Sequence, residues 1–302
     1  MTENEPLTLP RFSVALDLLR LAKPNIALLA ALTAAAGWLL GSGNITIGLI
    51  FPFVGTFLLA GGSATLNNLQ DRRLDACMAR TQNRPLPRGR IAPSAAWIST
   101  LTLVFAGLAL LGLSEHRPVT AAILGLAALA LYNGAYTRLK RRTPYATVPG
   151  ALVGMLPPLI GWAASGASFT VPQIWLVAGF YFLWQIPHFW LLLILNDADY
   201  VRAGLPVMTE RLAGPAMARV TATWMLACAL AGMICAASLH LGLAYSLPML
   251  AAPVLLIECA RRMLHAAPDA RAFRLAFNAV NLYALTATLL FGLGGLADPT
   301  FF

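Results

Sequence analysis

Nine apolar segments of membrane-spanning length follow one another along this chain, and they restrict the folds that it can adopt. A helix needs about 20 mainly apolar residues to cross a hydrocarbon core of about 30 Å. The segments lie at residues 24–42, 47–67, 94–113, 118–136, 146–165, 172–195, 217–239, 243–260 and 275–295. Only residues 1–22 are left over, as a short polar tail. We therefore expect one membrane-embedded domain over 1–302, an all-α integral membrane bundle of nine transmembrane helices.

The scarcity of charge supports this fold class. Charged residues make up 11% of the 302 residues and hydrophobic residues 59%, whereas a soluble domain carries about 25% charged residues. So few charges could not cover the surface of a water-soluble protein of this size. The tail also lacks the apolar core of a cleavable signal peptide.

The basic residues indicate the orientation of the bundle. If the nine segments alternate in direction, all but Arg117 of the 21 Lys and Arg residues fall on one side of the membrane. Cytoplasmic loops collect Lys and Arg, so we expect a cytoplasmic N-terminus and a C-terminus outside. The net charge of +9 then reflects topology and attraction to anionic substrates or head groups, and it does not indicate nucleic-acid binding.

The first polar cluster directly follows the second apolar segment. Asn67, Asp71 and Asp75 recur every four residues, a step that advances a helix by about 6 Å and turns it by about 400°. Continuation of the helix past residue 67 would place the three side chains on one stripe. Their oxygens suit Mg²⁺, which proteins often hold with one or two carboxylates plus substrate phosphates. The alternative is a solvated helix end whose aspartates pair with nearby arginines.

A second acidic cluster follows the sixth segment, with Asp197, Asp199 and Tyr200 in the sequence NDADY. Both clusters end even-numbered segments, so both are expected on the cytoplasmic side. Together they could bind a diphosphate through bridging Mg²⁺, which neutralises the oxygens of a leaving group.

Three further features have two interpretations each. The basic stretch 136–144 is either a topology anchor or a contact for an anionic substrate. His188 is either a packed core residue or a contact for a ligand such as haem, since the preceding Pro187 interrupts the helical ladder. Glu258 is either a structural residue, which extends to the membrane interface or pairs with Arg261 or Arg262, or a functional one.

Several motifs in order resemble the UbiA-type intramembrane prenyltransferases, and among them the protoheme IX farnesyltransferase (haem O synthase) branch. The motifs are NxxxDxxxD at 67–75, RTxNRPL at 80–86, KRRTP at 140–144, PPLIGW at 157–162, PHFW at 187–190 and DYxxAGxP at 199–206. The chain departs from that branch at Ala146, near Asp197 and over 204–212.

The resemblance implies a nine-helix bundle whose active site opens to the cytoplasm and binds Mg²⁺. It implies that Asn67, Asp71 and Asp75 are catalytic and hold the metal and diphosphate, and that Asp199, with Asp197, supplies a second metal side. The implied substrate contacts are Arg84, Lys140, Arg141, Tyr136, His188 and Tyr200.

The implied reaction transfers a farnesyl group from farnesyl diphosphate to a vinyl group of haem b, giving haem O for terminal oxidases. Haem b is then a substrate and not a resident cofactor. The expected setting is the inner membrane, with haem A synthase or oxidase assembly components as candidate partners. Alternatives are transfer to an aromatic or quinone-precursor acceptor, and an inactive paralogue that acts as a scaffold. A transporter fits less well, because transporters bind their substrates near the midplane.

Overall fold

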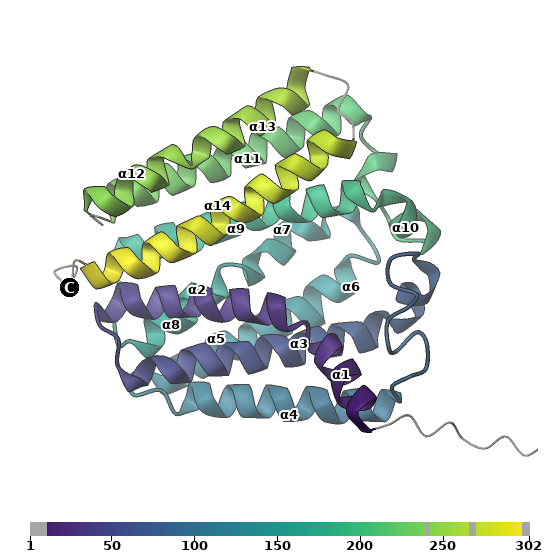
Figure 1. Ribbon diagram of the computed structural model, residues 1–302, viewed down its shortest axis with the longest axis horizontal. Helices are drawn as coiled ribbons and strands as arrows, with labels where there is room; N and C mark the ends of the chain where they lie inside the picture. Colours follow the sequence, from purple (N-terminus) through teal and green to yellow (C-terminus); the bar gives the residue numbers. More distant parts are fainter. Residues whose placement is uncertain (1–10, 240–241, 266–269, 298–302) are drawn as a thin grey trace, which may run out of the picture.

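The computed structural model describes residues 11–239, 242–265 and 270–297, and this part of the chain is helical without strands. The long helices lie side by side as a bundle (Figure 1). The α-helices are α1 (Arg11–Ala22), α2 (Pro24–Ser42), α3 (Ile50–Cys77), α4 (Pro93–Gly112), α5 (Pro118–Leu129), α6 (Thr137–Leu139), α7 (Thr147–Gly150), α8 (Leu156–Ala164), α9 (Pro172–Leu195), α10 (Asp197–Arg202), α11 (Gly214–Ser238), α12 (Leu243–Ala251), α13 (Pro253–His265) and α14 (Ala270–Ala297). Short 3₁₀ turns are η1 (Ile47–Leu49), η3 (Pro144–Ala146), η4 (Ala151–Val153) and η5 (Met208–Glu210), and η2 (Ala130–Tyr136) is a π-helix.

The described residues contain nine helical segments long and apolar enough to cross a membrane, as the sequence predicts. The second, Ile47–Cys77, runs 31 residues and extends past residue 67. The whole NxxxDxxxD motif therefore lies on the continuous helix α3. The fifth, Pro144–Ala164, is broken into η3, α7, η4 and α8. It begins at Pro144, and Pro149, Pro157 and Pro158 inside it interrupt the helical hydrogen-bond ladder.

Prolines also set where several helices begin. Helices α2, α4, α5, α9 and α13 each start at a proline, namely Pro24, Pro93, Pro118, Pro172 and Pro253. The first helical residue lacks an intrahelical partner for its N–H, so a proline there loses no hydrogen bond and contributes its fixed φ. The sequence thus defines these boundaries locally.

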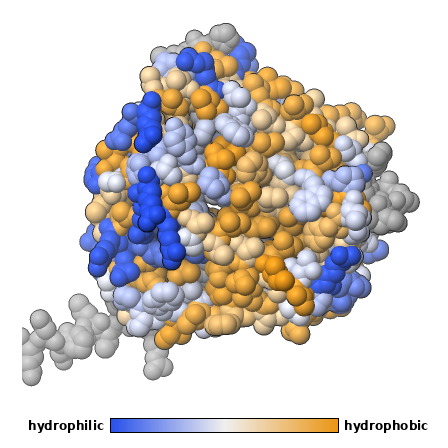
Figure 2. Space-filling view, turned by 180° about the vertical axis from the view of Figure 1, so that it is seen from behind, coloured by the Kyte–Doolittle hydropathy of each residue, from blue (hydrophilic) through white to orange (hydrophobic). Residues whose placement is uncertain are grey.

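The outer surface of the bundle is apolar over a broad band. Figure 2 shows hydrophobic residues across the centre of one face and a hydrophilic group along its left edge. That edge corresponds to the end of the bundle where α1 and α10 lie in Figure 1. The C-terminal end of α14 lies at the opposite end of the bundle. Large exposed side chains such as Ile98, Phe105 and Leu230 belong to the apolar surface. The protein is a multi-pass membrane protein, and which side of the membrane each end faces stays a prediction.

The tail contains structure that the sequence analysis did not predict. Residues 11–22 form α1, and its Asp17 is buried and forms ion pairs with Arg20 and Arg90 at 2.9 and 3.0 Å. Residues 1–10 lie outside the described residues. Helix α1 is thereby fixed to the loop that joins α3 to α4.

Glycines bring α2 and α8 into backbone contact. A Cβ atom at Gly161 would lie 1.8 Å from the Ala34 carbonyl oxygen, and one at Gly37 would lie 2.1 Å from the Pro158 carbonyl oxygen. Small residues at such positions let membrane helices approach closely and gain van der Waals packing.

We expect Gly161→Ala to destabilise the fold by about 1–3 kcal/mol, because the added methyl meets backbone atoms that cannot move independently. The matched control is Gly179→Ala on α9, where an added Cβ meets nothing within 4 Å. That change is expected to be neutral or stabilising by about 0.5–1 kcal/mol, because alanine is the better helix former. Unfolding of both variants in detergent measures the difference, and equal stability would contradict the backbone contact.

Candidate active site

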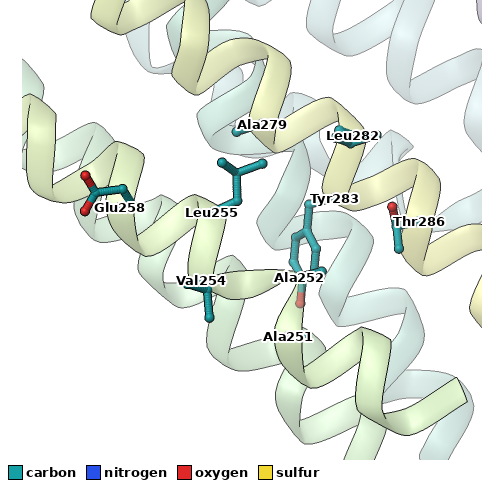
Figure 3. Close-up of a pocket in the computed structure, with 9 residues that line it drawn as sticks. All are labelled: Ala251, Ala252, Val254, Leu255, Glu258, Ala279, Leu282, Tyr283 and Thr286. Carbon is teal, nitrogen blue, oxygen red and sulfur yellow. The ribbon is translucent and has the colours of Figure 1, made fainter. Parts of the chain in front are cut away.

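A minor hollow lies between α12–α13 and α14 (Figure 3). Its volume is about 470 Å³, and Glu258 is the charged residue in its wall. The Glu258 carboxylate forms ion pairs with Arg261 and Arg262, both at 2.7 Å, which confirms the predicted pairing. The rest of the wall is mainly apolar.

The main cavity has a volume of about 1240 Å³ and collects most of the predicted site residues. Its walls come from α2, α3, η2, α9 and α14. The predicted residues in the wall are Asn67, Asp71, Asp75, Arg84, Tyr136, Lys140, His188 and Tyr200. Arg141 reaches the site through Asp71, and Asp197 and Asp199 lie outside the wall.

Asp71 is the most heavily contacted carboxylate of the site. One of its oxygens, Oδ2, accepts a hydrogen bond from Asn67 Nδ2 at 2.9 Å and another from Lys140 Nζ. The other, Oδ1, accepts from Arg141 Nη2 at 3.0 Å. Asp71 is buried, and a buried carboxylate is stable only when paired and hydrogen-bonded. The KRRTP motif is therefore held against the NxxxDxxxD helix.

Asp75, one turn later, is paired with the following loop. Both of its oxygens accept from Arg84 Nη1, at 3.1 and 2.9 Å, and the same nitrogen donates to Asn68 Oδ1 at 3.3 Å. The Thr81 hydroxyl donates to the Asp75 carbonyl at 2.9 Å. These contacts explain the spacing of the RTxNRPL motif, since Thr81 and Arg84 fold the loop back onto α3.

Asp199 connects the second acidic cluster to the loop that follows the first, by accepting hydrogen bonds from backbone N–H groups of that loop. Its carboxylate accepts from the N–H groups of Ala79 and Arg80 at 2.9 and 3.1 Å, and Arg202 lies 3.2 Å away. The hydrogen bonds from Arg80 and Ala79 lower the pKa of the Asp199 carboxyl below its ordinary value. Asp197 accepts from the Thr209 hydroxyl. The second cluster is thus packed against the loop after α3.

A π-helix shapes the wall between these polar groups and the apolar interior. Within η2, the rings of Tyr132 and Tyr136 stack at 5.6 Å, and Tyr136 stacks on Phe189 of α9 at 5.3 Å. Asn133 fixes η2 to α3 by accepting from the Ser63 hydroxyl at 2.6 Å. Short π-helical segments occur frequently at functional sites.

Lys23 and Tyr132 line the cavity and were missed by the sequence analysis. Lys23 sits between α1 and α2 with a left-handed φ of 48°. The Lys-Pro pair directly before the first span was the signal that could have drawn attention to it. Burial, and then the neighbouring Arg84, lowers the pKa of Lys23 to about 8.

The pKa of Lys23 predicts how the affinity for an anionic substrate depends on pH. Its ammonium is charged below about pH 8 and neutral above, so anion affinity should fall as the pH rises through 8, by up to about tenfold per unit. The KM of the protein for its anionic substrate, measured from about pH 7 to 9.5, tests this. Lys23→Arg stays charged throughout and should flatten the profile, whereas an unchanged wild-type KM would exclude the role.

The charges of the cavity favour an anion. Six basic residues line it, and Asp71 and Asp75 are its acidic ones. The basic residues are Arg20, Lys23, Arg80, Arg84, Arg90 and Lys140. The excess of positive charge suits a substrate that carries several negative charges, such as a diphosphate.

The donor atoms of α3 also fit Mg²⁺. Two buried carboxylates and the Asn67 amide oxygen present only oxygen ligands to the cavity. Among the described residues, no group of three or more His, Cys, Asp or Glu side chains is arranged to hold a metal. Phosphate oxygens of a substrate would complete such a site, as is usual for Mg²⁺.

Exposed apolar side chains of two helices form part of the cavity wall. Ile26 and Leu29 of α2, and Leu282 and Leu285 of α14, line the cavity and are among the exposed large apolar side chains. Helices α2 and α14 are neighbours in the bundle, and we expect the cavity to open toward the lipid between these four residues.

The fold and the cavity together are those of an intramembrane protein whose cavity joins a polar, basic end to apolar walls. The UbiA prenyltransferase family model matches residues 27–285, and the chain belongs to this family. It is a prenyltransferase.

Relatives and solved structures agree with the assignment. A protoheme IX farnesyltransferase of Geobacter sulfurreducens is 43% identical over 189 residues, which are 63% of this chain and 69% of the relative. A digeranylgeranylglyceryl phosphate synthase structure has a TM-score of 0.76 at 15% identity, covering 95% of this chain and 100% of the other. A UbiA homologue from Archaeoglobus fulgidus bound to GPP and Mg²⁺ has a TM-score of 0.68 at 15% identity, covering 93% and 100%. At such identities the two structures bear on the fold alone.

Proposed function

We propose that the protein transfers a farnesyl group from farnesyl diphosphate to a vinyl group of haem b, giving haem O. The observation that carries the proposal is the 43% identity to a protein named protoheme IX farnesyltransferase. The order of the motifs RTxNRPL, KRRTP and PHFW supports the same acceptor.

The size and polarity of the cavity support a reaction of two substrates. Pockets for one small ligand usually measure about 300–1,000 Å³, and the cavity, at about 1240 Å³, is larger. Its polar end holds Asp71, Asp75 and their cations, and its apolar walls suit an isoprenoid chain and a porphyrin. Both substrates can then meet away from bulk water.

We assign the polar end to the diphosphate. Lys23, Arg84, Lys140 and Arg141 would bind its oxygens and stabilise the charge that develops as it leaves. Mg²⁺, held by Asp71 and Asp75 with Asn67, would neutralise further charge on the leaving group. We also propose Asp199 and Asp197 as metal ligands on the second side of the site. To bind a metal ion, Asp199 would have to release the N–H groups of Ala79 and Arg80.

The residues of the cavity wall suggest how the remaining steps of the reaction proceed. The carbon–oxygen bond of the donor breaks to leave diphosphate, and the allylic carbon gains positive charge beside the stacked rings of Tyr132 and Tyr136. A carbon–carbon bond then forms with the haem vinyl group. Water supplies the hydroxyl group of the product and loses one proton. Tyr200, which lines the cavity, is proposed as a further substrate contact.

The proposed setting follows from the distribution of charge. With the basic end toward the cytoplasm, the active site opens to the cytoplasmic side of the inner membrane. Farnesyl diphosphate and haem b are then the small-molecule partners within the lipid bilayer. Haem A synthase and oxidase assembly components are the proposed protein partners.

Purified protein in lipid nanodiscs, incubated with haem b, farnesyl diphosphate and Mg²⁺, tests the proposal. We expect a farnesylated, hydroxylated haem by liquid chromatography and mass spectrometry. A panel of aromatic quinone precursors in parallel reactions serves as the comparison. Prenylation of a panel member without any haem product would contradict the proposed acceptor, and no product with any acceptor would favour the scaffold alternative.

A further inference from the structure

His188 of α9 is fixed in the cavity wall by a residue of α14. Its Nδ1 atom lies 2.6 Å from Oδ1 of Asn281, and both residues line the main cavity. The two residues are 93 positions apart, so the contact is a product of the fold and no sequence motif contains it.

The hydrogen bonds of Asn281 determine which nitrogen of His188 carries the proton. Asn281 Nδ2 donates to the carbonyl oxygen of Phe277 at 2.8 Å. A carbonyl can only accept, so this bond fixes the amide with Oδ1 toward His188. Oδ1 in turn can only accept, and therefore Nδ1 carries the proton. In the neutral ring, Nε2 is left with a free lone pair.

Aromatic rings hold the imidazole in place. Its centroid lies 5.0 Å from that of Trp184, 5.2 Å from that of Phe277 and 5.7 Å from that of Phe189. Trp184 is itself fixed, since its Nε1 donates to the Val280 carbonyl at 3.1 Å. Within the described ranges Nε2 has no hydrogen-bond partner. Nε2 is not among the buried side-chain atoms without a partner, so it is open to the cavity, where a ligand can reach its lone pair.

We propose that His188 ligates the iron of the acceptor haem through Nε2, and that Asn281 positions it by holding Nδ1–H. The inference rests on the proposed function, since it requires a metalloporphyrin acceptor. Histidines that bind metals usually donate their other N–H to a carbonyl or carboxylate oxygen, which fixes the tautomer and the ring orientation. The pair of His188 and Asn281 has this arrangement before any ligand binds.

The position of His188 relates the acceptor to the donor. Phe189 contacts the His188 ring on one side and stacks on Tyr136 on the other. The Lys140 ammonium lies 5.7 Å from the Tyr136 ring centroid and pairs with Asp71. A chain of contacts thus runs from the proposed diphosphate site to the proposed iron ligand, and the reacting carbons would meet beside Phe189.

The test is a titration of ferric haem into wild-type and variant proteins in nanodiscs, followed by absorption and electron paramagnetic resonance spectra. We expect the wild type to show a histidine-ligated haem and His188→Ala to lose that signature, with added imidazole restoring it. His188→Met keeps most of the bulk and should show a changed ligand signature. Asn281→Leu should weaken haem affinity roughly 10- to 100-fold. Asn281→Asp keeps an acceptor oxygen for Nδ1–H but loses the bond to Phe277, so it should retain the histidine-ligated spectrum with a smaller loss of affinity.

Product formation by the same samples separates failure of the inference from failure of the proposed function. Farnesylated haem from the wild type, together with haem spectra that are identical in wild type, His188→Ala and His188→Met, would overturn iron ligation while leaving the function intact. Equal haem affinity of wild type and Asn281→Leu would overturn the positioning role. If the wild type forms no farnesylated haem and binds no haem, both the function and the inference fail.

Discussion

Asp71→Asn is expected to slow prenyl transfer by on the order of 10²–10³-fold, the usual cost of removing one preorganised electrostatic contact from an active site. The Asp71 carboxylate contacts three residues of the proposed diphosphate site, Asn67, Lys140 and Arg141. Asparagine keeps the shape of the side chain but removes its charge. Both the proposed metal contact and the alignment of the two cations are then weakened. Initial rates at saturating donor and acceptor measure the effect.

Stability must be separated from catalysis in this variant, because removing one partner of a buried ion pair can cost about 3–5 kcal/mol. Asp17→Asn is the matched control. Asp17 is also buried and also pairs with two cations, Arg20 and Arg90. These two arginines line the cavity, but the Asp17 carboxylate does not, and it pairs with none of the residues assigned to the diphosphate. We expect both variants to lose stability and only Asp71→Asn to lose activity by this factor. Equal activity of the two would refute a catalytic role for Asp71.

Removal of divalent cations is expected to abolish turnover, and the structure predicts a specific form of metal dependence. Asp71 and Asp75 are already paired with Lys140, Arg141 and Arg84. Mg²⁺ alone would have to displace these cations, whereas a diphosphate brings oxygens that both the cations and the metal can share. Mg²⁺ should therefore bind weakly by itself and more tightly with the donor, and by linkage the donor should bind more tightly with Mg²⁺ by the same factor.

Calorimetric titration of Mg²⁺, with and without a non-hydrolysable farnesyl diphosphate analogue, measures this coupling. A coupling of about 1–3 kcal/mol, or 5- to 150-fold in affinity, is typical of linked sites. Arg84→Gln frees Asp75 from its partner and should strengthen the binding of Mg²⁺ alone. Metal binding that is equally tight with and without the analogue would rule out the shared site.

The parts of this architecture that depend on local sequence could be predicted. The nine apolar segments follow from their length, and the stripe of Asn67, Asp71 and Asp75 follows from the helical period once α3 continues to Cys77. The pairing of Glu258 also follows from helical spacing, because Arg261 and Arg262 lie three and four residues later. The residues of the stripe share one helix, and so do Glu258 and its two arginines.

The parts that depend on contacts between distant segments could not be predicted. The hydrogen bonds of Asp199 come from backbone N–H groups 120 and 119 residues away, and no side-chain pattern reveals a backbone donor. The π-helix η2 is held by the contact of Asn133 with Ser63, 70 residues earlier. Ala146, where the sequence departs from the protoheme IX farnesyltransferase branch, is buried in η3 and does not line the cavity. The catalytic and binding roles of the site residues stay predictions.

The expected opening toward the lipid along α2 and α14 has a kinetic consequence. A donor with an isoprenoid tail and a prenylated product can pass between the cavity and the bilayer beside Ile26 and Leu285 without entering water. The concentration that governs the rate is then the mole fraction of substrate in the membrane. Diluting the enzyme and a fixed amount of donor with more lipid should lower the rate, even though the total volume of the sample is unchanged. The enzyme would thus obey surface-dilution kinetics, in which the bilayer is the reaction solvent.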